Sequence, residues 1–383
     1  SMTMESGNIS AVRKTPNSNG QYGVGVTDGG DFTMTGGKIE AGWFAVAGNG
    51  NYKTQNSIIN ITDGELISTA DYAVYLPQSG TTTISGGKVY GAAGGVCIQR
   101  GTLNVEGTAL ITSKGTGSTG NWGDGTGGLD CAAINVSGAY GIATVNIKGG
   151  TLIAEAKSLI TEGTTYTPVI NVTGGTFSDP SVLKYMATNA TVDIKLLSNI
   201  NIAKTELATG YILNAANATA NLNLNGHDII NSSETADATP FTQIFTVQNG
   251  TLNISGNGNV KCDASATAKD DGYRMVIEAR GYGTVNIHGG SYYNTQKLNT
   301  QIDLIYAREN GKINIYGGTF ESGKYGTPNN DTDGRYWVLN LKNTDKNTAS
   351  IQVSGGTFIN FNPANPNMDD NESYLVTGYE VTR

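Results

Sequence analysis

The chain has 383 residues, of which 53 are glycine and 15% are charged, and its formal net charge is −8. No apolar run approaches the roughly 18 residues of a membrane-spanning helix, and no glycine period of three indicates collagen. Lys and Arg do not cluster, whereas binding to phosphates needs concentrated positive charge. We therefore expect neither a nucleic-acid partner nor insertion into a membrane.

A short phrase recurs along the chain: an apolar residue, a polar residue, a second apolar residue, any residue, and then one or two glycines. Full copies occur at Val145–Leu152, Ile170–Phe177, Val285–Tyr292, Ile313–Phe320 and Ile351–Phe358, and two more end at Gly37 and Gly87. Copies with one glycine occur at Thr3–Ile9, Ile59–Leu66, Leu103–Ala109, Leu222–Ile229 and Leu252–Gly258, and a looser copy surrounds Ile194. These make about 13 units of roughly 29 residues, with period-two alternation and no helical period, as is typical of a β-solenoid.

The alternation within each phrase predicts which side chains point outward. The flanking apolar residues point into the interior and the central polar residue points out. Stacked repeats then place eight asparagines on one external line, best explained as a ladder of amides: Asn60, Asn104, Asn146, Asn171, Asn223, Asn253, Asn286 and Asn314. The glycine pair fits a tight corner at which the backbone takes a positive φ.

The repeats resemble those of the right-handed parallel β-helix of the pectin-lyase-like type, in particular the glycine-rich repeats of bacterial surface proteins and of phage tail or tailspike proteins. The resemblance is carried by the phrase Val-Asn-Ile-x-Gly-Gly-Thr-Phe and by residues 222–227, 355–363 and 376–381, and it extends over nearly the whole chain. It implies an all-β fold, a right-handed parallel β-helix solenoid of about 13 coils. Because this fold hosts lyases, hydrolases, adhesins and structural spikes, it implies no single activity.

A change in the repeat near residue 188 predicts two β-helix modules, 1–187 and 188–383, stacked into one continuous rod, with a short helix over 181–188 at the junction. The first repeat begins at Thr3 without a capping segment, so we expect the rest of a longer parent chain to precede it. The three cysteines, Cys97, Cys131 and Cys262, are interpreted as small core residues, with one disulfide and a free thiol as the alternative.

Two loops interrupt the repeat. The first, between Ile111 and Cys131, is rich in glycine and contains Trp122, which either contacts a ligand or packs on the rod. The second, from Ser322 to Tyr336, contains Asp331 and Asp333, whose oxygens are weak candidates for a calcium site because the later Glu of an EF-hand loop is absent. No other metal ligand and no cofactor is expected.

Strands that precede the repeat phrases bring several charged residues together. Arg280, Arg308 and Lys342 should lie on successive coils, and Glu278 and Tyr306 should stack two positions earlier, with Asn340 beside them. A mixture of Arg, carboxylate and aromatic side chains suits a sugar polymer. The alternative is a solvated ladder in which Glu278 offsets its basic neighbours.

The sequence motifs of known catalytic sites are mostly absent or incomplete. The Asn-Thr-Asp of polygalacturonases occurs at residues 343–345, but no Gly-His-Gly or Arg-x-Lys follows and the segment falls at a corner. We expect an extracellular, cell-surface or virion module for adhesion or display that binds a polysaccharide or other glycan and is not an enzyme. A polysaccharide lyase or hydrolase and a purely structural spacer are the alternatives, and the oligomeric state is left open.

Overall fold

The computed structural model is nearly all β, in agreement with the predicted fold class. It describes residues 1–12, 21–48, 56–118, 128–162, 165–202, 210–231, 241–262, 273–294, 302–322, 336–366 and 373–382. Among these residues, strands account for 56% and helices for 3%, and none of their helices has the length and apolar character needed to cross a bilayer. The chain divides into two compact units, Ser1–Tyr185 (unit 1) and Met186–Arg383 (unit 2).

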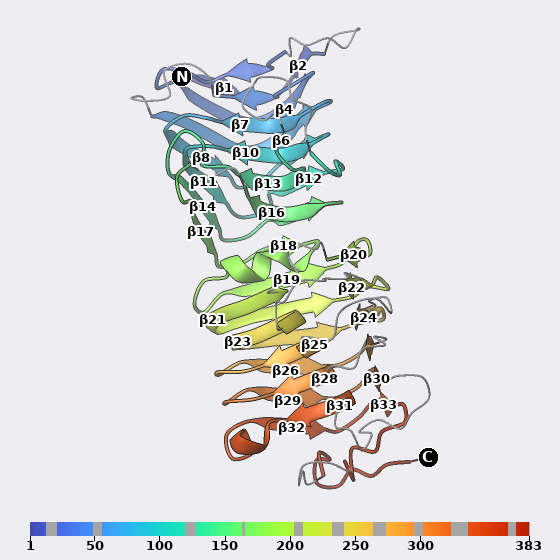
Figure 1. Ribbon diagram of the computed structural model, residues 1–383. Helices are drawn as coiled ribbons and strands as arrows, with labels where there is room; N and C mark the ends of the chain where they lie inside the picture. Colours follow the sequence, from blue (N-terminus) through green and yellow to red (C-terminus); the bar gives the residue numbers. More distant parts are fainter. Residues whose placement is uncertain are drawn as a thin grey trace. The chain divides into compact units, whose positions relative to one another are not determined.

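Unit 1 consists of three stacks of parallel strands. The first stack contains β1 (Met2–Met4), the first part of β4 (Asp31–Ala41) and of β6 (Ser57–Ser68), β8 (Gly80–Ile84), β11 (Gly101–Val105), β14 (Ala143–Ile147) and β17 (Val169–Val172). The second contains β2 (Asn8–Ala11), the later parts of β4 and β6, β9 (Lys88–Gly91), β12 (Leu110–Ser113), β15 (Thr151–Ala154) and β18 (Thr176–Phe177). The third contains β3 (Val24–Gly25), β5 (Val46–Ala47), β7 (Tyr72–Leu76), β10 (Gly94–Ile98), β13 (Ala132–Val136) and β16 (Lys157–Thr161), several of which lie side by side in Figure 1.

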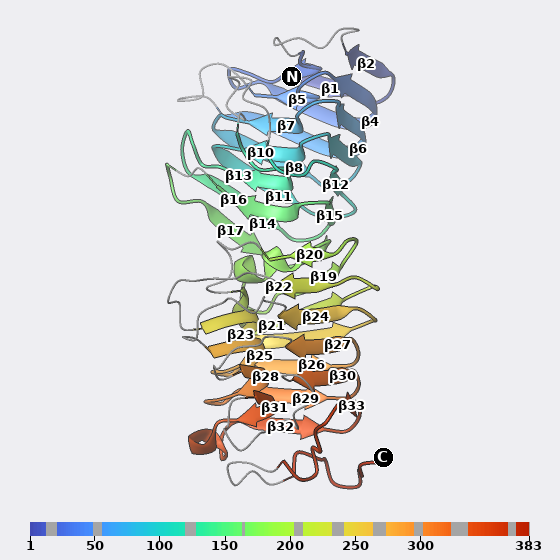
Figure 2. The ribbon, with the colours of Figure 1, turned by 45° about the vertical axis from the view of Figure 1, so that its right-hand side comes forward.

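Unit 2 has the same three kinds of stack. The first contains β19 (Thr191–Lys195), the later parts of β21 (Tyr211–Asn223) and β23 (Phe241–Ser255), β26 (Thr284–Ile287), β29 (Lys312–Ile315) and β32 (Ser350–Val353). The second contains β20 (Ile200–Asn201), β22 (Ile229–Asn231), β24 (Asn259–Cys262), β27 (Ser291–Asn294), β30 (Thr319–Ser322) and β33 (Thr357–Phe358), seen on one side in Figure 2. The third contains the first parts of β21 and β23, then β25 (Tyr273–Ala279), β28 (Ile302–Ala307) and β31 (Tyr336–Leu341), and it is followed by a one-turn helix, η3 (Asn343–Asp345).

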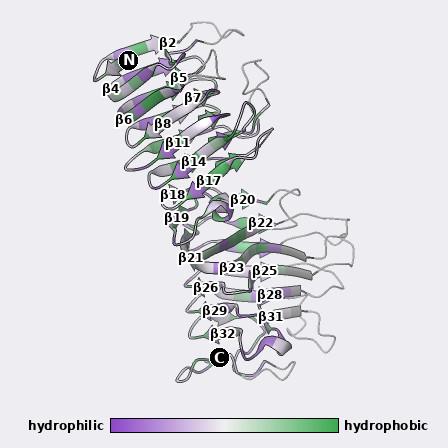
Figure 3. Ribbon diagram, turned by 90° about the vertical axis from the view of Figure 1, so that its left-hand side faces the viewer, coloured by the Kyte–Doolittle hydropathy of each residue, from purple (hydrophilic) through white to green (hydrophobic). Residues whose placement is uncertain are grey.

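Rows of apolar side chains form the core of each unit. In unit 1, Ile84 pairs with Val105 and Val105 with Ile147, and all three are fully buried. In unit 2, the rings of Tyr292 and Phe320 stack with their centroids 5.0 Å apart. Figure 3 shows hydrophilic and hydrophobic residues on the same strand, for example on β6, as the period-two pattern requires. Each row buries its members against equivalent residues of the next repeat.

The two glycines of a full phrase are needed for different reasons. Gly87 has a φ of +73°, in the region that residues with a Cβ avoid. Gly86 has an ordinary φ, but a Cβ on it would lie 2.1 Å from the carbonyl oxygen of Thr62 in the preceding repeat. The second glycine therefore makes the turn, and the first permits the close approach of two corners. The predicted positive φ at the corner is confirmed at the second position of the pair.

The asparagine ladder is present in each unit, with two corrections. Asn60 lies in the row of unit 1, but it pairs with Thr83, which separates it from Asn104. In unit 1, Asn171 donates to Asn146 and Asn146 to Asn104, each at 3.0 Å between Nδ2 and Oδ1. In unit 2 the row runs through Asp193, Asn221, Asn253, Asn286 and Asn314. The placement of Asn223 in this row was wrong, since Asn223 pairs with Ser255 and Asn221 with Asn253.

The three cysteines and the short helix agree with the sequence. Cys97, Cys131 and Cys262 are all buried and form no disulfide, so the interpretation of them as core residues is confirmed and the disulfide alternative is wrong. A short helix occurs close to the predicted position as η1 (Pro180–Tyr185), a 3-10 helix that begins one residue earlier than expected.

Replacement of Gly86 by Ala tests the close approach at the corner. The added methyl group meets backbone that has no room to move aside, so Gly86→Ala should lower the free energy of unfolding by about 1–3 kcal/mol. Gly25→Ala is the matched control, because Gly25 has no positive φ and nothing within 4 Å of its Cβ position, and it should leave stability unchanged or slightly higher. Denaturant unfolding followed by circular dichroism measures both, and equal losses would contradict this explanation.

Candidate functional site

The third stack of unit 2 brings most of the predicted ligand-binding residues together. Glu278 pairs in register with Tyr306, and Tyr306 with Asn340. Arg308 and Lys342 come directly after the last residues of β28 and β31. The backbone N–H of Arg308 donates to the Ala279 carbonyl at 3.1 Å, and that of Lys342 donates to the Ala307 carbonyl at 3.0 Å. The parallel register thus places Glu278, Tyr306 and the cations beside one another.

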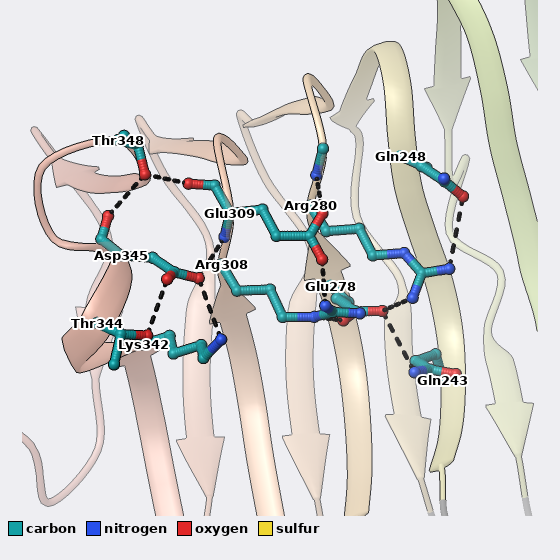
Figure 4. A network of polar contacts seen from close by, with 11 residues as sticks. Gln243, Gln248, Glu278, Arg280, Arg308, Glu309, Lys342, Thr344, Asp345 and Thr348 are labelled. Atoms are coloured by element: carbon teal, nitrogen blue, oxygen red, sulfur yellow. Dashed lines mark hydrogen bonds and ion pairs between the residues drawn. The ribbon is translucent and has the colours of Figure 1, made fainter.

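Glu278 lies at the centre of this group, and only 1% of its side chain is exposed. Its Oε1 accepts a hydrogen bond from Arg308 Nε at 2.6 Å, and its Oε2 accepts one from Gln243 Nε2 at 3.3 Å (Figure 4). Arg280 Nη1 lies 3.9 Å from the same Oε2. A buried carboxylate is costly unless it is paired and hydrogen-bonded, and Glu278 has both kinds of partner.

Two further carboxylates extend the group toward the surface. Glu309 pairs with Arg308 Nη1 and also accepts the Gly281 N–H at 3.0 Å. Asp345, in η3, accepts from the Glu309 N–H at 2.6 Å and lies 3.5 Å from Lys342 Nζ. The hydrogen bond from the Glu309 N–H lowers the pKa of Asp345 below its ordinary value. We call the connected set the Glu278 network: Gln243, Gln248, Glu278, Arg280, Arg308, Glu309, Lys342 and Asp345.

Arg280 is the least satisfied cation of the network. Its Nη2 reaches Gln248 Oε1 only at 3.5 Å, and its buried Nε has no hydrogen-bond partner in the part of the chain that the structure describes. Tyr282 follows in the same tight turn, which is closed by a 2.9 Å bond from the Gly283 N–H to the Arg280 carbonyl, and 76% of Tyr282 is exposed. A guanidinium whose side chain is 30% exposed therefore lies in the same turn as an exposed aromatic ring.

Asp303 forms a second buried acid next to the network. Asn340 Nδ2 donates to Asp303 Oδ1 at 2.9 Å. Burial raises the pKa of Asp303 to about 7, a shift that the Asn340 hydrogen bond opposes and the charge of Glu278 reinforces. Burial, followed by the charge of Asp303, raises the pKa of Tyr306 to about 12. Acids with a strongly shifted pKa concentrate at functional sites, and structural ion-pair networks shift pKa values as well.

Three of the predicted site residues, Trp122, Asp331 and Asp333, lie outside the described residues. Within the described ranges, no group of three His, Cys, Asp or Glu side chains is arranged to hold a metal ion. The Asn-Thr-Asp segment forms η3 at a corner, where Asp345 serves the network.

Several participants were not predicted from the sequence. Gln243 and Gln248 both come from β23, and Glu309 and Asp345 come from corners, where no repeat position identifies them. Unit 1 also holds an aromatic cluster in which Phe44 stacks on Tyr75 with ring centroids 4.7 Å apart, and Tyr22 and Trp43 pack beside Phe44. Aromatic residues spaced about one repeat apart, such as Phe44 and Tyr75, are the signal that could have identified this cluster.

The raised pKa of Asp303 predicts a pH dependence of stability. Its carboxyl stays protonated up to about pH 7 in the folded chain, whereas its ordinary value is 3.8. Unfolding therefore releases a proton when the pH lies between 3.8 and about 7. Over this range the contribution of Asp303 to stability falls as the pH rises, by at most about 1.4 kcal/mol per pH unit, and above it the contribution levels off. Asp303→Asn removes this titrating carboxyl group. The unfolding free energy of the wild type minus that of the variant should therefore decrease from pH 4 to 7. Urea denaturation at several pH values measures it, and a constant difference would argue against the buried acid.

The central role of Glu278 is tested by neutralising it. Glu278→Gln removes the buried counter-charge of Arg308, which is 25% exposed and keeps Glu309, and it should lower the free energy of unfolding by about 1–3 kcal/mol. Glu309→Gln removes a charge whose side chain is 44% exposed, and it should cost at most about 1 kcal/mol. Denaturant unfolding of both variants gives the comparison, and similar losses would show that Glu278 is not the centre of the network.

Comparisons with known proteins add no family to this description. No family model, no curated protein and no solved structure matches the chain. The geometry of the Glu278 network and the exposure of its neighbours therefore provide the argument for function.

Proposed function

We propose that this chain is a right-handed parallel β-helix of about 13 coils, of the pectin-lyase-like type, which serves as an extracellular module for adhesion or display and binds a glycan. The parallel registers support the fold, because equivalent residues of successive repeats pair in all three stacks of both units. A location at a cell surface or on a virion is part of this proposal.

The observation that carries the proposed function is the turn that holds Arg280 and Tyr282. Tyr282 offers an exposed ring for the apolar face of a sugar, and Arg280, whose side chain is 30% exposed, offers its Nη N–H groups to a sugar oxygen. Glu278 and Gln248 hold the arginine by contacts from two different strands. A ring and a donor held in this way are the elements of a shallow saccharide site.

A depolymerase is the second candidate, and Asp303 is the observation that favours it. A carboxyl group with a pKa near 7 is suited to general acid or base catalysis, and Tyr306 and Arg308 lie close by. Against it, Asp303 is almost fully buried. An enzyme would shorten the polymer that it binds, whereas an adhesin would leave its length unchanged.

A structural spacer is the third candidate. The pairing of Arg308 with Glu278 and Glu309 favours it, because charges that satisfy one another need no ligand. A spacer would bind no polymer under any condition, so the same measurement separates it from the other two functions.

Affinity electrophoresis through gels that contain a panel of polysaccharides, with calcium present, tests the proposal. Wild type should be retarded by at least one polymer, and the polymer should remain intact. Tyr282→Ala should weaken the retardation about tenfold or more, as loss of a central aromatic contact does. Tyr316→Ala is the matched control, because 51% of Tyr316 is exposed and its ring stacks on His288 away from the network.

Each result has a distinct meaning. Shortening of the polymer would make the chain a depolymerase, and the absence of retardation would favour the spacer. Equal effects of Tyr282→Ala and Tyr316→Ala would remove the Arg280 turn as the contact surface. Trp122→Ala in the same assay tests the loop predicted from the sequence.

A further inference from the structure

The charges of the Glu278 network cancel one another. Its three cations, Arg280, Arg308 and Lys342, face three carboxylates, those of Glu278, Glu309 and Asp345. Every cation lies within 4.0 Å of at least one of these acids. The charges balance within the network, so the network adds no excess of positive charge to the surface around Tyr282.

Asp303 does not change this balance in favour of anions. Its buried carboxyl is neutral when protonated and adds a negative charge when ionised. The chain as a whole carries a formal net charge of −8, which repels polyanions at low ionic strength. The charge balance within the network and the negative charge of the whole chain therefore both disfavour an acidic ligand.

An acidic ligand would also have to displace an internal partner. A ligand carboxylate could reach Arg308 Nε only by taking the place of Glu278, which is 1% exposed and cannot turn out into water, and it could reach Arg308 Nη1 only by displacing Glu309. Leaving a buried carboxylate unpaired costs far more than a partly exposed ion pair returns. Arg308 is therefore occupied by the protein itself.

The groups that remain available suit neutral oxygens. The side chain of Arg280 is 30% exposed, and those of Glu309 and Lys342 are each 44% exposed at the rim. A sugar hydroxyl both donates and accepts hydrogen bonds, so it can use an arginine N–H and a carboxylate oxygen without disturbing an ion pair. Tyr282 adds the exposed ring for the apolar face of the sugar.

We infer that the glycan recognised at the Glu278 network is a polymer of neutral sugars, and not one that carries uronate or sulfate groups. This inference rests on the proposed function. It reverses the simplest expectation from the three cations alone, which would be an acidic polysaccharide.

The experiment uses pairs of polymers that differ in charge but share a backbone, such as a polyuronate and its carboxyl-reduced form, together with neutral glucans, mannans and xylans. Affinity electrophoresis of the full chain is run at about 20 mM and 500 mM NaCl, which changes the screening length severalfold. Retardation should occur with neutral polymers only, and salt should change it by less than about twofold. Retardation by a polyuronate that disappears at high salt would overturn the inference while leaving glycan binding intact. Retardation by no polymer would instead overturn the proposed function.

A charge variant tests the reason for the exclusion of anions. Glu309→Gln leaves the network with one excess positive charge and should create retardation by the polyuronate at low salt. Glu321→Gln is the matched control, because it removes the same charge from an exposed position on β30 in the second stack, and it should create none. Equal behaviour of the two variants would show that local charge balance does not set the selectivity.

Discussion

Parallel pairing between equivalent residues of successive repeats is the constraint on which both units depend. It turns each position of the repeat into a row whose members lie one strand spacing apart, about 4.8 Å. An interior row must be apolar along its whole length, as Ile84, Val105 and Ile147 are. A corner row must leave room for the backbone of its neighbour, as Gly86 does beneath Thr62.

The same constraint explains how the Glu278 network arises. A row need not repeat one residue, and Glu278, Tyr306 and Asn340 form a mixed row in which the buried acid holds Arg308 from the next strand. The corners are not bound by the row, so they differ in length from repeat to repeat. Asp345 reaches the network from such a corner. Rows therefore place the centre of the network, and corners supply its outer charges.

The sequence predicts the rows better than the corners. Alternation and glycine positions were enough to predict the all-β class, the asparagine ladder and the proximity of Arg280 to Arg308. Asn223 was misplaced because a slip of two residues keeps every side chain on the same face, so periodicity cannot distinguish Asn221 from Asn223. The pairing of Arg308 with Glu309 was missed because it depends on the path of a corner, which no repeat pattern encodes.

The asparagine rows have a direction. Each amide donates to the residue of the preceding repeat, as Asn253 does to Asn221 and Asn286 to Asn253, so the side-chain dipoles of a row point the same way. Asp193 begins the row of unit 2, where it accepts from Asn221 at 3.0 Å. An ionised carboxylate accepts but cannot donate, so aspartate is compatible with the first place and would interrupt any later one. Aspartate therefore fits the first place of the row, where a side chain accepts a hydrogen bond and has no preceding residue of the row to which it must donate.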